Sequence, residues 1–461
     1  MSLLNSGRRQ RFIFILAFAS ALAALLVATW WAYHAGLAGD FLFDDFANLP
    51  VLGATGPVRT WTAFWRYISS GDADPTGRPL TLLTFLIDAR NWPASPYPFK
   101  VTNVILHLIN GALLVGVLWK LGNALTQKRD IRSSLTETRN FVTKPDSSAA
   151  ESEIQPSLQN ESWIQGSAPT QRGQPRNNKE GLLGNRSGVA IAALFGAGVW
   201  LLHPLFVSTT LYIVQREAML PATFVLIGML GWMAARDALA RSHIKRAIVG
   251  MAFSAWGCTA FAVLSKANGA LFPILLLLTE WIVLAPYRSM PNDALEQCRK
   301  VAVRIFLVLP SALVIGYLLY LLPSVIANTP AARGWTVGER LLTESRVVTD
   351  YLRLLFVPHA HSTGLFNDQF PVSTGLLHPA STLPCITLIL ALIGSGFALR
   401  KKHPAIALAL LFYFAAQLME SGWLSLELYF EHRNYLPAML LFWPIGLILA
   451  RPDAPTWRRA V

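Results

Sequence analysis

The chain contains a series of apolar runs that are each long enough to cross a lipid bilayer as a helix. A transmembrane helix needs roughly 20 mostly apolar residues, because the hydrocarbon core of a bilayer is about 30 Å thick. Such runs lie at residues 12–33, 99–119, 187–206, 217–235, 247–264, 269–286, 302–322, 382–399, 404–420 and 435–450. Charged residues make up only 14% of the chain, whereas soluble domains carry roughly 25%. The sequence therefore predicts an all-α, polytopic integral membrane protein with about ten transmembrane helices, within boundary errors of a few residues.

Basic residues in the connecting segments predict the orientation of these helices. The net charge is +13, and the positive side chains collect between alternate apolar runs, at 236–246, 288–304, 400–403 and 451–459. Short basic loops stay in the cytoplasm, so both termini are expected there, and the charge does not indicate a nucleic-acid partner. The outer loops are then 34–98, 207–216, 265–268, 323–381 and 421–434. Amphipathic patterns around 79–90 and 339–357 predict surface helices in the first and fourth outer loops.

The chain divides into three predicted segments. Residues 1–121 hold the first two transmembrane helices and the first outer loop, and residues 187–461 hold the remaining helices. Between them, residues 122–186 are rich in Ser, Thr, Asn, Gln, Gly and Pro, which predicts a disordered cytoplasmic insert. This insert is a linker or, alternatively, a tail that docks a partner. The three cysteines are scattered and have no disulfide or metal-ligand spacing.

Two adjacent carboxylates, Asp44 and Asp45, follow the first apolar run in an aromatic setting. Packing at the membrane interface explains the tryptophans of this loop. It does not explain the carboxylates, because adjacent acids repel each other unless something binds them. We therefore interpret Asp44 and Asp45 as catalytic residues. One acts as general base on an acceptor hydroxyl, and its neighbour orients it or holds a metal ion.

Polar residues near the outer ends of other spans are candidates for substrate binding. Asn103 and His107 are four residues apart and share one helix face, where they either bind substrate or form interhelical hydrogen bonds. Arg216 requires a partner at this depth, either the adjacent Glu217 or a bound anion. Lys266 lies in the turn between two spans, as a phosphate ligand or as a lysine that extends to the membrane surface.

Two further outer segments carry charge that packing does not readily explain. The predicted amphipathic helix of the fourth outer loop carries Arg340, Arg346 and Arg353, which bind a lipid phosphate or are solvated. Glu431, His432 and Arg433 cluster at the outer mouth of the last span. Arg433 could clamp two phosphate oxygens, and Glu431 could fix Arg433 or bind a sugar.

An ordered set of short motifs runs over nearly the whole chain. In chain order it comprises Phe43-Asp44-Asp45, Arg78-Pro79-Leu80, Asn103 with His107, His203-Pro204 with Arg216, Lys266, Tyr351-Leu352-Arg353, and Glu431-His432-Arg433 with Tyr435 and Pro437. No single motif is specific, but the ordered set resembles the GT-C superfamily of polytopic glycosyltransferases. Within it, the chain is similar to bacterial relatives of protein O-mannosyltransferases and of the transmembrane tetratricopeptide mannosyltransferases. It also resembles the type IV pilin arabinosyltransferases.

This resemblance implies an inverting transfer of a sugar from a polyprenyl-phosphate donor to a hydroxyl of a protein or a cell-envelope glycan. An aspartate of the pair would deprotonate the acceptor, and Arg and Lys side chains would stabilise the departing lipid phosphate. The resemblance leaves open which aspartate is the base and whether a divalent cation takes part. It implies a bacterial inner-membrane protein in contact with membrane lipid, with a periplasmic active site. The candidate substrate-binding residues are Arg78, Asn103, His107, Arg216, Lys266, Arg346, Glu431, His432 and Arg433.

The chain departs from the family pattern at three places. The family often has an acid soon after the His-Pro motif, another directly after the lysine, and a tyrosine before Arg-Pro. This chain has Val207-Ser208-Thr209, Ala267 and Gly77 there, which leaves the sugar and the use of a metal open.

Two other classes remain as alternatives. A transporter or lipid-linked sugar flippase predicts polar residues at the bilayer midplane and internal repeats, but the polar residues here gather at the outer ends of the spans. A membrane scaffold would need neither the aspartate pair nor the Glu431–Arg433 cluster.

Overall fold

The computed structural model describes residues 2–142, 178–358 and 369–450. Over these residues the protein is helical, and its only β-type pairings are two isolated bridges, Ala54 with Gly56 and Gly375 with His378. The prediction of an all-α, polytopic membrane protein is confirmed.

Apolar helices occupy every one of the predicted runs, but not all of them are long enough to span a membrane alone. Seven described helices are long and apolar enough to cross a membrane: Phe12–Ala38, Pro96–Thr126, Ile213–Ala240, Ile244–Ser265, Ala267–Tyr287, Asp293–Arg333 and Thr382–Leu399. An eighth span counts if the pair Ser187–Leu201 and Pro204–Leu211, bent by 53°, crosses as one unit. Proline disfavours helical backbone in the residue before it, which explains the break at His203. The last two predicted spans are the shorter helices Pro404–Ala416 and Pro437–Leu449.

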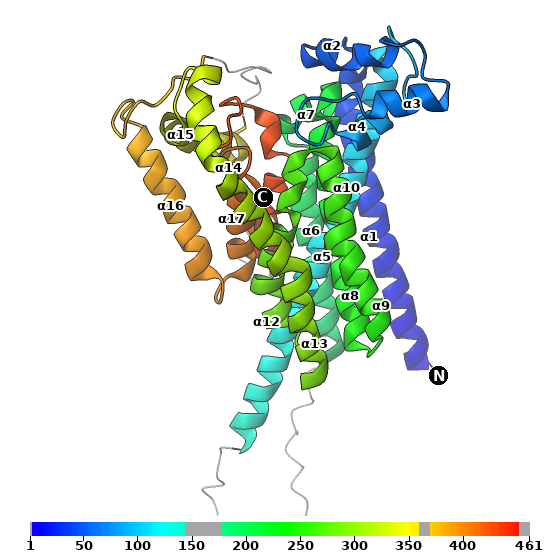
Figure 1. The fold of residues 1–461 in the computed structure, drawn as a ribbon. Helices are drawn as coiled ribbons and strands as arrows, with labels where there is room; N and C mark the ends of the chain where they lie inside the picture. The colour runs from blue at the N-terminus through cyan, green and yellow to red at the C-terminus, as the bar shows by residue number, and fades with distance from the viewer. Residues whose placement is uncertain (1, 143–177, 359–368, 451–461) are drawn as a thin grey trace, which may run out of the picture.

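The helices fall into a bundle and a group of short elements at one of its ends. The bundle helices are α1 (Ser2–His34), α5 (Pro96–Val142), α6 (Asn178–Leu201), α8 (Arg216–Ala240), α9 (Ile244–Ala252), α10 (Cys258–Ser265), α11 (Phe272–Thr279), α12 (Ala285–Tyr287), α13 (Asp293–Val303), α14 (Leu309–Arg333), α16 (Thr382–Leu399), α17 (Pro404–Ala416) and α18 (Trp443–Leu449). The remaining α-helices are α2 (Asp44–Asn48), α3 (Trp61–Ile68), α4 (Pro79–Phe85), α7 (Val207–Leu211) and α15 (Val337–Phe356). Figure 1 shows this second set at the upper end, here called the cap end, while α13 and the N-terminus lie at the other end.

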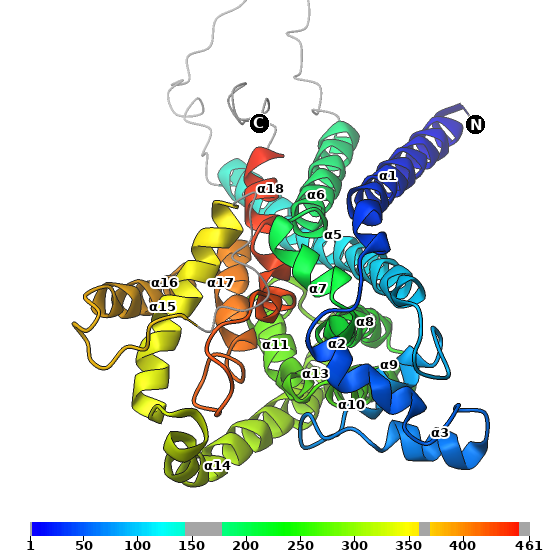
Figure 2. The same ribbon diagram turned by 90° about the horizontal axis from the view of Figure 1, so that it is seen from above.

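Short π-helical and 3-10 segments complete the chain. The π-helical turns are η5 (Phe253–Gly257), η7 (Glu280–Leu284) and η8 (Arg304–Val308). The 3-10 turns are η1 (Ala35–Ala38), η2 (Leu49–Gly53), η3 (Pro204–Phe206), η4 (Ile213–Gln215), η6 (Ala267–Leu271), η9 (Glu431–Asn434) and η10 (Pro437–Leu440). In the view from the cap end, α15 and α16 lie on one side of the bundle and α3 on the other (Figure 2).

Large side chains and close helix contacts form the core. Trp200, Trp232 and Trp443 are fully buried in one hydrophobic cluster. Helices α6 and α18 approach closely because glycine lies on both sides of their contact. A Cβ on Gly196 would lie 2.9 Å from the Trp443 Cα, and one on Gly446 would lie 2.7 Å from the Ala192 carbonyl oxygen. Small residues of this kind let membrane helices pack backbone to backbone.

The two predicted surface helices are present. Helix α4 has seven residues, too few to span a bilayer. Helix α15 begins with a capping box, in which Thr336 and Glu339 exchange side-chain and backbone hydrogen bonds, and it ends at Phe356, just before Pro358. Both helices lie at the cap end, so the amphipathic patterns identified them correctly.

The predicted insert at 122–186 is flanked by longer helices than the sequence indicated. Helix α5 continues to Val142 and α6 starts at Asn178. Residues 143–177 lie outside the described residues, so the disorder expected there stays a prediction.

Candidate functional site

Segments that are distant in sequence converge at the cap end around a cavity of about 450 Å³, here called the central cavity. Its lining residues are Asp44, Asn48, Ala73, Arg78, Val214, Gln215, Glu217, Lys266, Glu420, Leu426, Glu427, Phe430, His432 and Arg433. Five of the predicted site residues are among them: Asp44, Arg78, Lys266, His432 and Arg433. The structure thus brings together motifs from the first, second, third and fifth outer loops.

The two adjacent aspartates have different surroundings. Asp44 lines the cavity and is partly exposed. Asp45 is fully buried, and both of its carboxylate oxygens accept backbone N–H groups, from Leu42 at 2.9 Å and from Val214 at 2.8 Å. Burial raises the pKa of the Asp45 carboxyl from its ordinary 3.8 to about 6, against the lowering effect of these N–H groups. Asp44 can therefore reach a bound molecule, whereas Asp45 fastens the loop that carries it.

A chain of buried hydrogen bonds holds this loop in position. The N–H of Asp44 donates to the Tyr212 hydroxyl at 2.8 Å. The side-chain amide of Asn103 donates to the carbonyls of Tyr212 and Ile213, at 3.4 and 3.3 Å, and its Oδ1 accepts from Arg216 Nε at 2.7 Å. Asn103 and Arg216 thus lie behind the cavity wall, where they fix the backbone that binds the aspartate pair.

The sequence suggests Glu217 as one possible partner of Arg216, but the structure pairs Arg216 with another residue. Its guanidinium lies 2.6 Å from the Asp88 carboxylate and donates to the carbonyls of Thr84 and Phe99, both at 2.9 Å. Successive residues on a helix point about 100° apart, so Glu217 points elsewhere, into the central cavity. There it forms an ion pair with Arg78.

A tight loop presents Arg78 to the cavity. A Cβ on Gly71 would lie 1.9 Å from the Gly77 carbonyl oxygen, so the loop can close only with glycine at this crossing. Gly77 and Arg78 both have positive φ, 67° and 51°, which turns the chain sharply. Arg78 Nε then donates to Asp74 at 2.9 Å, across the turn.

Lys266 is held between two carboxylates that the sequence interpretation did not select. Its ammonium lies 3.1 Å from Glu420 and 3.9 Å from Glu217. Asn268 also donates to Glu420, at 2.7 Å. Glu420 is nearly fully buried, so these donors replace the water that a carboxylate would otherwise need.

Arg433 lies among three carboxylates at distances longer than hydrogen bonds. Its nitrogens are 3.6 Å from Glu420, 3.8 Å from Glu344 and 3.9 Å from Glu427, and Nη1 donates to the Leu428 carbonyl at 3.2 Å. Burial raises the pKa of Glu344 to about 7, so this acid is partly protonated near neutral pH. The long distances to these carboxylates leave the Arg433 guanidinium with donors for an anionic ligand.

His432 supplies a neutral polar group to the cavity. Its ring lies 5.0 Å from the Phe430 ring, centroid to centroid. Burial, with the charges of Lys266, Arg433 and Arg78, lowers the pKa of His432 well below its ordinary 6.5. A neutral imidazole can donate one hydrogen bond and accept another, which suits hydroxyl groups of a substrate.

Other predicted site residues lie outside the central cavity. His107 is fully buried and forms hydrogen bonds with the Tyr435 hydroxyl at 2.8 Å and the Leu201 carbonyl at 2.9 Å. Of the two roles that the sequence allows for His107, the structure thus shows the hydrogen bonds between helices. Glu431 is buried next to Ser208, whose hydroxyl donates to it at 3.4 Å. Arg346 holds the chain after α15, because it donates to the Pro371 carbonyl at 2.7 Å.

Arg340, which the sequence suggests as a ligand for lipid phosphate, instead shapes one wall of the cavity. It is fully buried in α15 and donates to the backbone carbonyls of Glu420, Gly422, Leu426 and Glu427. One guanidinium thereby clamps the loop that leads to Phe430 and Arg433.

The arrangement combines the partly exposed Asp44 carboxylate with three cations, Arg78, Lys266 and Arg433, each next to acidic partners. Such a site can remove a proton from a hydroxyl group and stabilise a phosphate that leaves with negative charge. In the part of the chain that the structure describes, no three His, Cys, Asp or Glu side chains are grouped as a metal site requires.

Comparison with known proteins gives a partial similarity. Over 99 residues the chain is 34% identical to a protein O-mannosyl-transferase of Caenorhabditis elegans. The match covers 20% of this chain and 14% of that protein. No family model matches the chain, and no solved structure matches it.

Proposed function

We propose that this protein is a membrane glycosyltransferase and that the central cavity is its active site. One observation carries the proposal: the Asp44 carboxylate lines the same cavity as Lys266, Arg78 and Arg433, at the surface end of an apolar helix bundle. The partial similarity to a protein O-mannosyl-transferase supports the same class of reaction.

In the proposed reaction, Asp44 accepts the proton of an acceptor hydroxyl as its oxygen attacks the anomeric carbon of the donor sugar. The bond between that carbon and the phosphate oxygen breaks, and its electron pair leaves with the polyprenyl phosphate. Attack opposite the leaving group inverts the anomeric centre. Arg78, Lys266 and Arg433 stabilise the phosphate charge, an electrostatic contribution that is often the largest single one in group transfer.

The position of the cavity supports a donor that is anchored in the membrane. A polyprenyl-phosphate donor is anchored in the bilayer, so its phosphate reaches a site at the end of the bundle. The basic segments predict that this end faces the periplasm of a bacterial inner membrane. The acceptor is then a protein or glycan hydroxyl on that side.

The test is sugar transfer by the purified full chain in detergent micelles, with a panel of radiolabelled polyprenyl-phosphate sugars headed by mannose. Wild type is compared with Lys266→Met and with Lys245→Met, a matched control at an exposed lysine of the opposite end. We expect transfer, or slow donor hydrolysis, that falls by about 10²–10³-fold in Lys266→Met and is unchanged in Lys245→Met. A chelator arm shows whether a divalent cation is required. No turnover of any donor by folded wild type would contradict the proposal and favour a transporter.

A further inference from the structure

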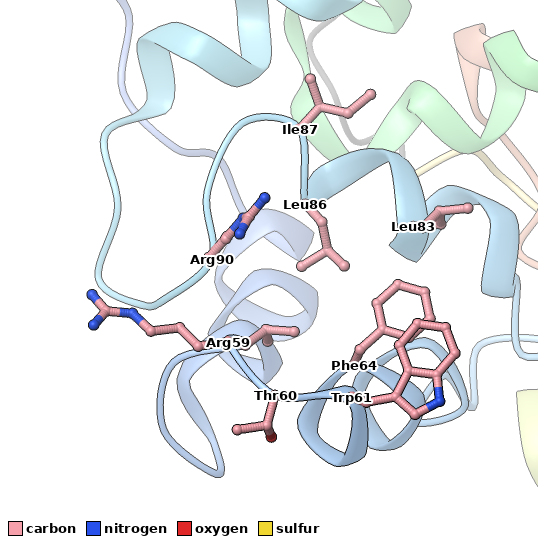
Figure 3. Close-up of a pocket in the computed structure, with 9 residues that line it drawn as sticks. Arg59, Thr60, Trp61, Phe64, Leu83, Leu86, Ile87 and Arg90 are labelled. Carbon is pink, nitrogen blue, oxygen red and sulfur yellow. The ribbon is translucent and has the colours of Figure 1, made fainter.

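A second cavity of about 450 Å³ lies between α3 and α4, on the outer side of the first outer loop (Figure 3). Trp61 and Phe64 of α3 lie opposite Leu83 of α4, and Leu86 and Ile87 line the pocket just after α4 ends. The wall is therefore largely apolar. This cavity, here called the lateral pocket, contains none of the residues proposed for sugar transfer, and the inference below is independent of that function.

Hydrogen bonds place the lateral pocket at the level of the membrane surface. The Thr81 hydroxyl of α4 donates to the carbonyl of Ser265, the last residue of α10. Arg216, the first residue of α8, donates to the carbonyl of Thr84. Because Arg216 and Ser265 lie at the cap ends of two helices that are long and apolar enough to cross a membrane, α4 lies where the hydrocarbon meets the headgroups.

Large apolar side chains around the pocket are exposed at this level. Trp61 is 71% exposed, Trp65 52% and Ile87 73%. Side chains of this size are unfavourable in water, whereas tryptophan is enriched at the bilayer interface. The exposure indicates that this side of α3 and α4 contacts lipid.

Two arginines form the polar rim of the pocket. Arg59 and Arg90 are exposed, and neither has an ion pair with another residue in the described ranges. The Val58 N–H donates to the Arg90 carbonyl at 2.7 Å, which ties the two segments together. In Figure 3, Arg59 and Arg90 lie on one side of the pocket, and Trp61 and Phe64 lie on the other.

We propose that the lateral pocket binds an anionic diacyl phospholipid of the bilayer. Its phosphate would lie at the rim that carries Arg59 and Arg90, since one guanidinium can bind two phosphate oxygens at once. Its acyl chains would run along Trp61, Phe64 and Ile87. The two unpaired positive charges select an anionic headgroup over a zwitterionic one.

The test measures lipid binding to the purified full chain by native mass spectrometry in detergent. Dioleoylphosphatidylglycerol is the probe, and dioleoylphosphatidylcholine, glycerophosphoglycerol and undecaprenyl phosphate are compared with it. The double variant Arg59→Gln/Arg90→Gln removes the rim charges, and Arg59→Lys/Arg90→Lys keeps them. Arg66→Gln is the matched control, because Arg66 is exposed on α3 but does not line the pocket. A photo-crosslinking residue in place of Ile87 locates the bound lipid.

We expect phosphatidylglycerol to bind about tenfold more tightly than phosphatidylcholine and to crosslink at position 87. Binding should weaken about tenfold in the double Gln variant, recover in the double Lys variant, and stay within about twofold of wild type in Arg66→Gln. Equal binding of both phospholipids, or equal loss in Arg66→Gln, would overturn the proposal. If glycerophosphoglycerol, which has no acyl chains, displaced phosphatidylglycerol, the pocket would bind the anionic headgroup alone and the proposed lipid site would be wrong. Tighter binding of undecaprenyl phosphate would assign the pocket to a donor lipid instead.

Discussion

At the scale of single residues, the adjacent carboxylates of Asp44 and Asp45 lie in different surroundings. Asp45 points into the protein, where backbone N–H groups occupy both of its oxygens, and Asp44 points into the central cavity. These surroundings could not be predicted from the sequence, because the Val214 N–H that binds Asp45 is 169 residues away along the chain. Only the folded chain shows which carboxylate a substrate can touch.

The raised pKa of Asp45 predicts how the stability of the protein depends on pH. Its pKa in the folded protein, about 6, lies above the ordinary value of 3.8 because of burial. A raised pKa gives stability that is fully present below about pH 4 and is lost as the pH rises through about 6. We expect Asp45→Asn to lower the free energy of unfolding by roughly 1–3 kcal/mol, since its amide turns a donor toward a backbone N–H.

The difference in unfolding free energy between wild type and Asp45→Asn should shrink as the pH rises from about 4 to about 6. Only wild type has a carboxyl group at this position that loses its proton over that range. Denaturation in detergent, followed by circular dichroism at pH values from 4 to 7, measures this difference. A difference between the two proteins that is independent of pH would show that Asp45 does not titrate in this window.

At the scale of elements, α15 and the loop after α17 form one unit through Arg340. Its guanidinium donates to four carbonyls of residues 420–427 and lies 3.0 Å from Glu344, which in turn faces Arg433. Arg340 is thus a positioning residue for Arg433, acting through the loop and through Glu344.

We expect Arg340→Met to cost roughly 3–5 kcal/mol of unfolding free energy, because it leaves buried carbonyls and the buried Glu344 without their partner. Sugar transfer should fall mainly through a higher KM for the donor, as Arg433 loses its orientation. Arg353→Met is the control on the same helix. Arg353 is about half exposed and pairs with Asp350, so its loss should cost less than about 1 kcal/mol. Equal effects of both variants would remove the special role of Arg340.

Apolar runs and the amphipathic period predicted the bundle and α15, because burial in lipid or at its surface imposes a periodic pattern. Charged partners impose no such pattern. Glu420 reads as an ordinary acid near an apolar run, and only the fold brings it to Lys266, 154 positions earlier in the chain. The adjacency of Arg216 and Glu217 suggests an ion pair, but on the helix their side chains point apart and find separate partners, Asp88 and Arg78.

At the scale of the whole molecule, the two ends of the bundle carry different polar features. The central cavity, the lateral pocket and the amphipathic helices share the cap end. The opposite end carries the exposed basic segment 241–246 and a buried ion-pair cluster, in which Glu280 binds Arg236 and Arg299. This asymmetry agrees with a protein whose two ends face different compartments.

Orientation can be tested with single cysteines in a background where the three native ones are replaced by serine. We expect Asp72→Cys, exposed at the cap end, to react with a membrane-impermeant maleimide on cells whose outer membrane alone is permeabilised. Lys245→Cys, exposed at the other end, should react only after the inner membrane is opened. Labelling of the two positions in the reverse order would place the central cavity in the cytoplasm.

The most direct test of the account is to measure sugar transfer and thermal midpoint together for Asp44→Asn and Asp45→Asn. We predict that Asp44→Asn keeps the wild-type midpoint and loses transfer by about 10²–10⁴-fold, as expected when a general base is removed. Asp45→Asn should lower the midpoint and keep part of its activity in the fraction that stays folded. Wild-type transfer by a folded Asp44→Asn would contradict the assignment of the central cavity as the active site.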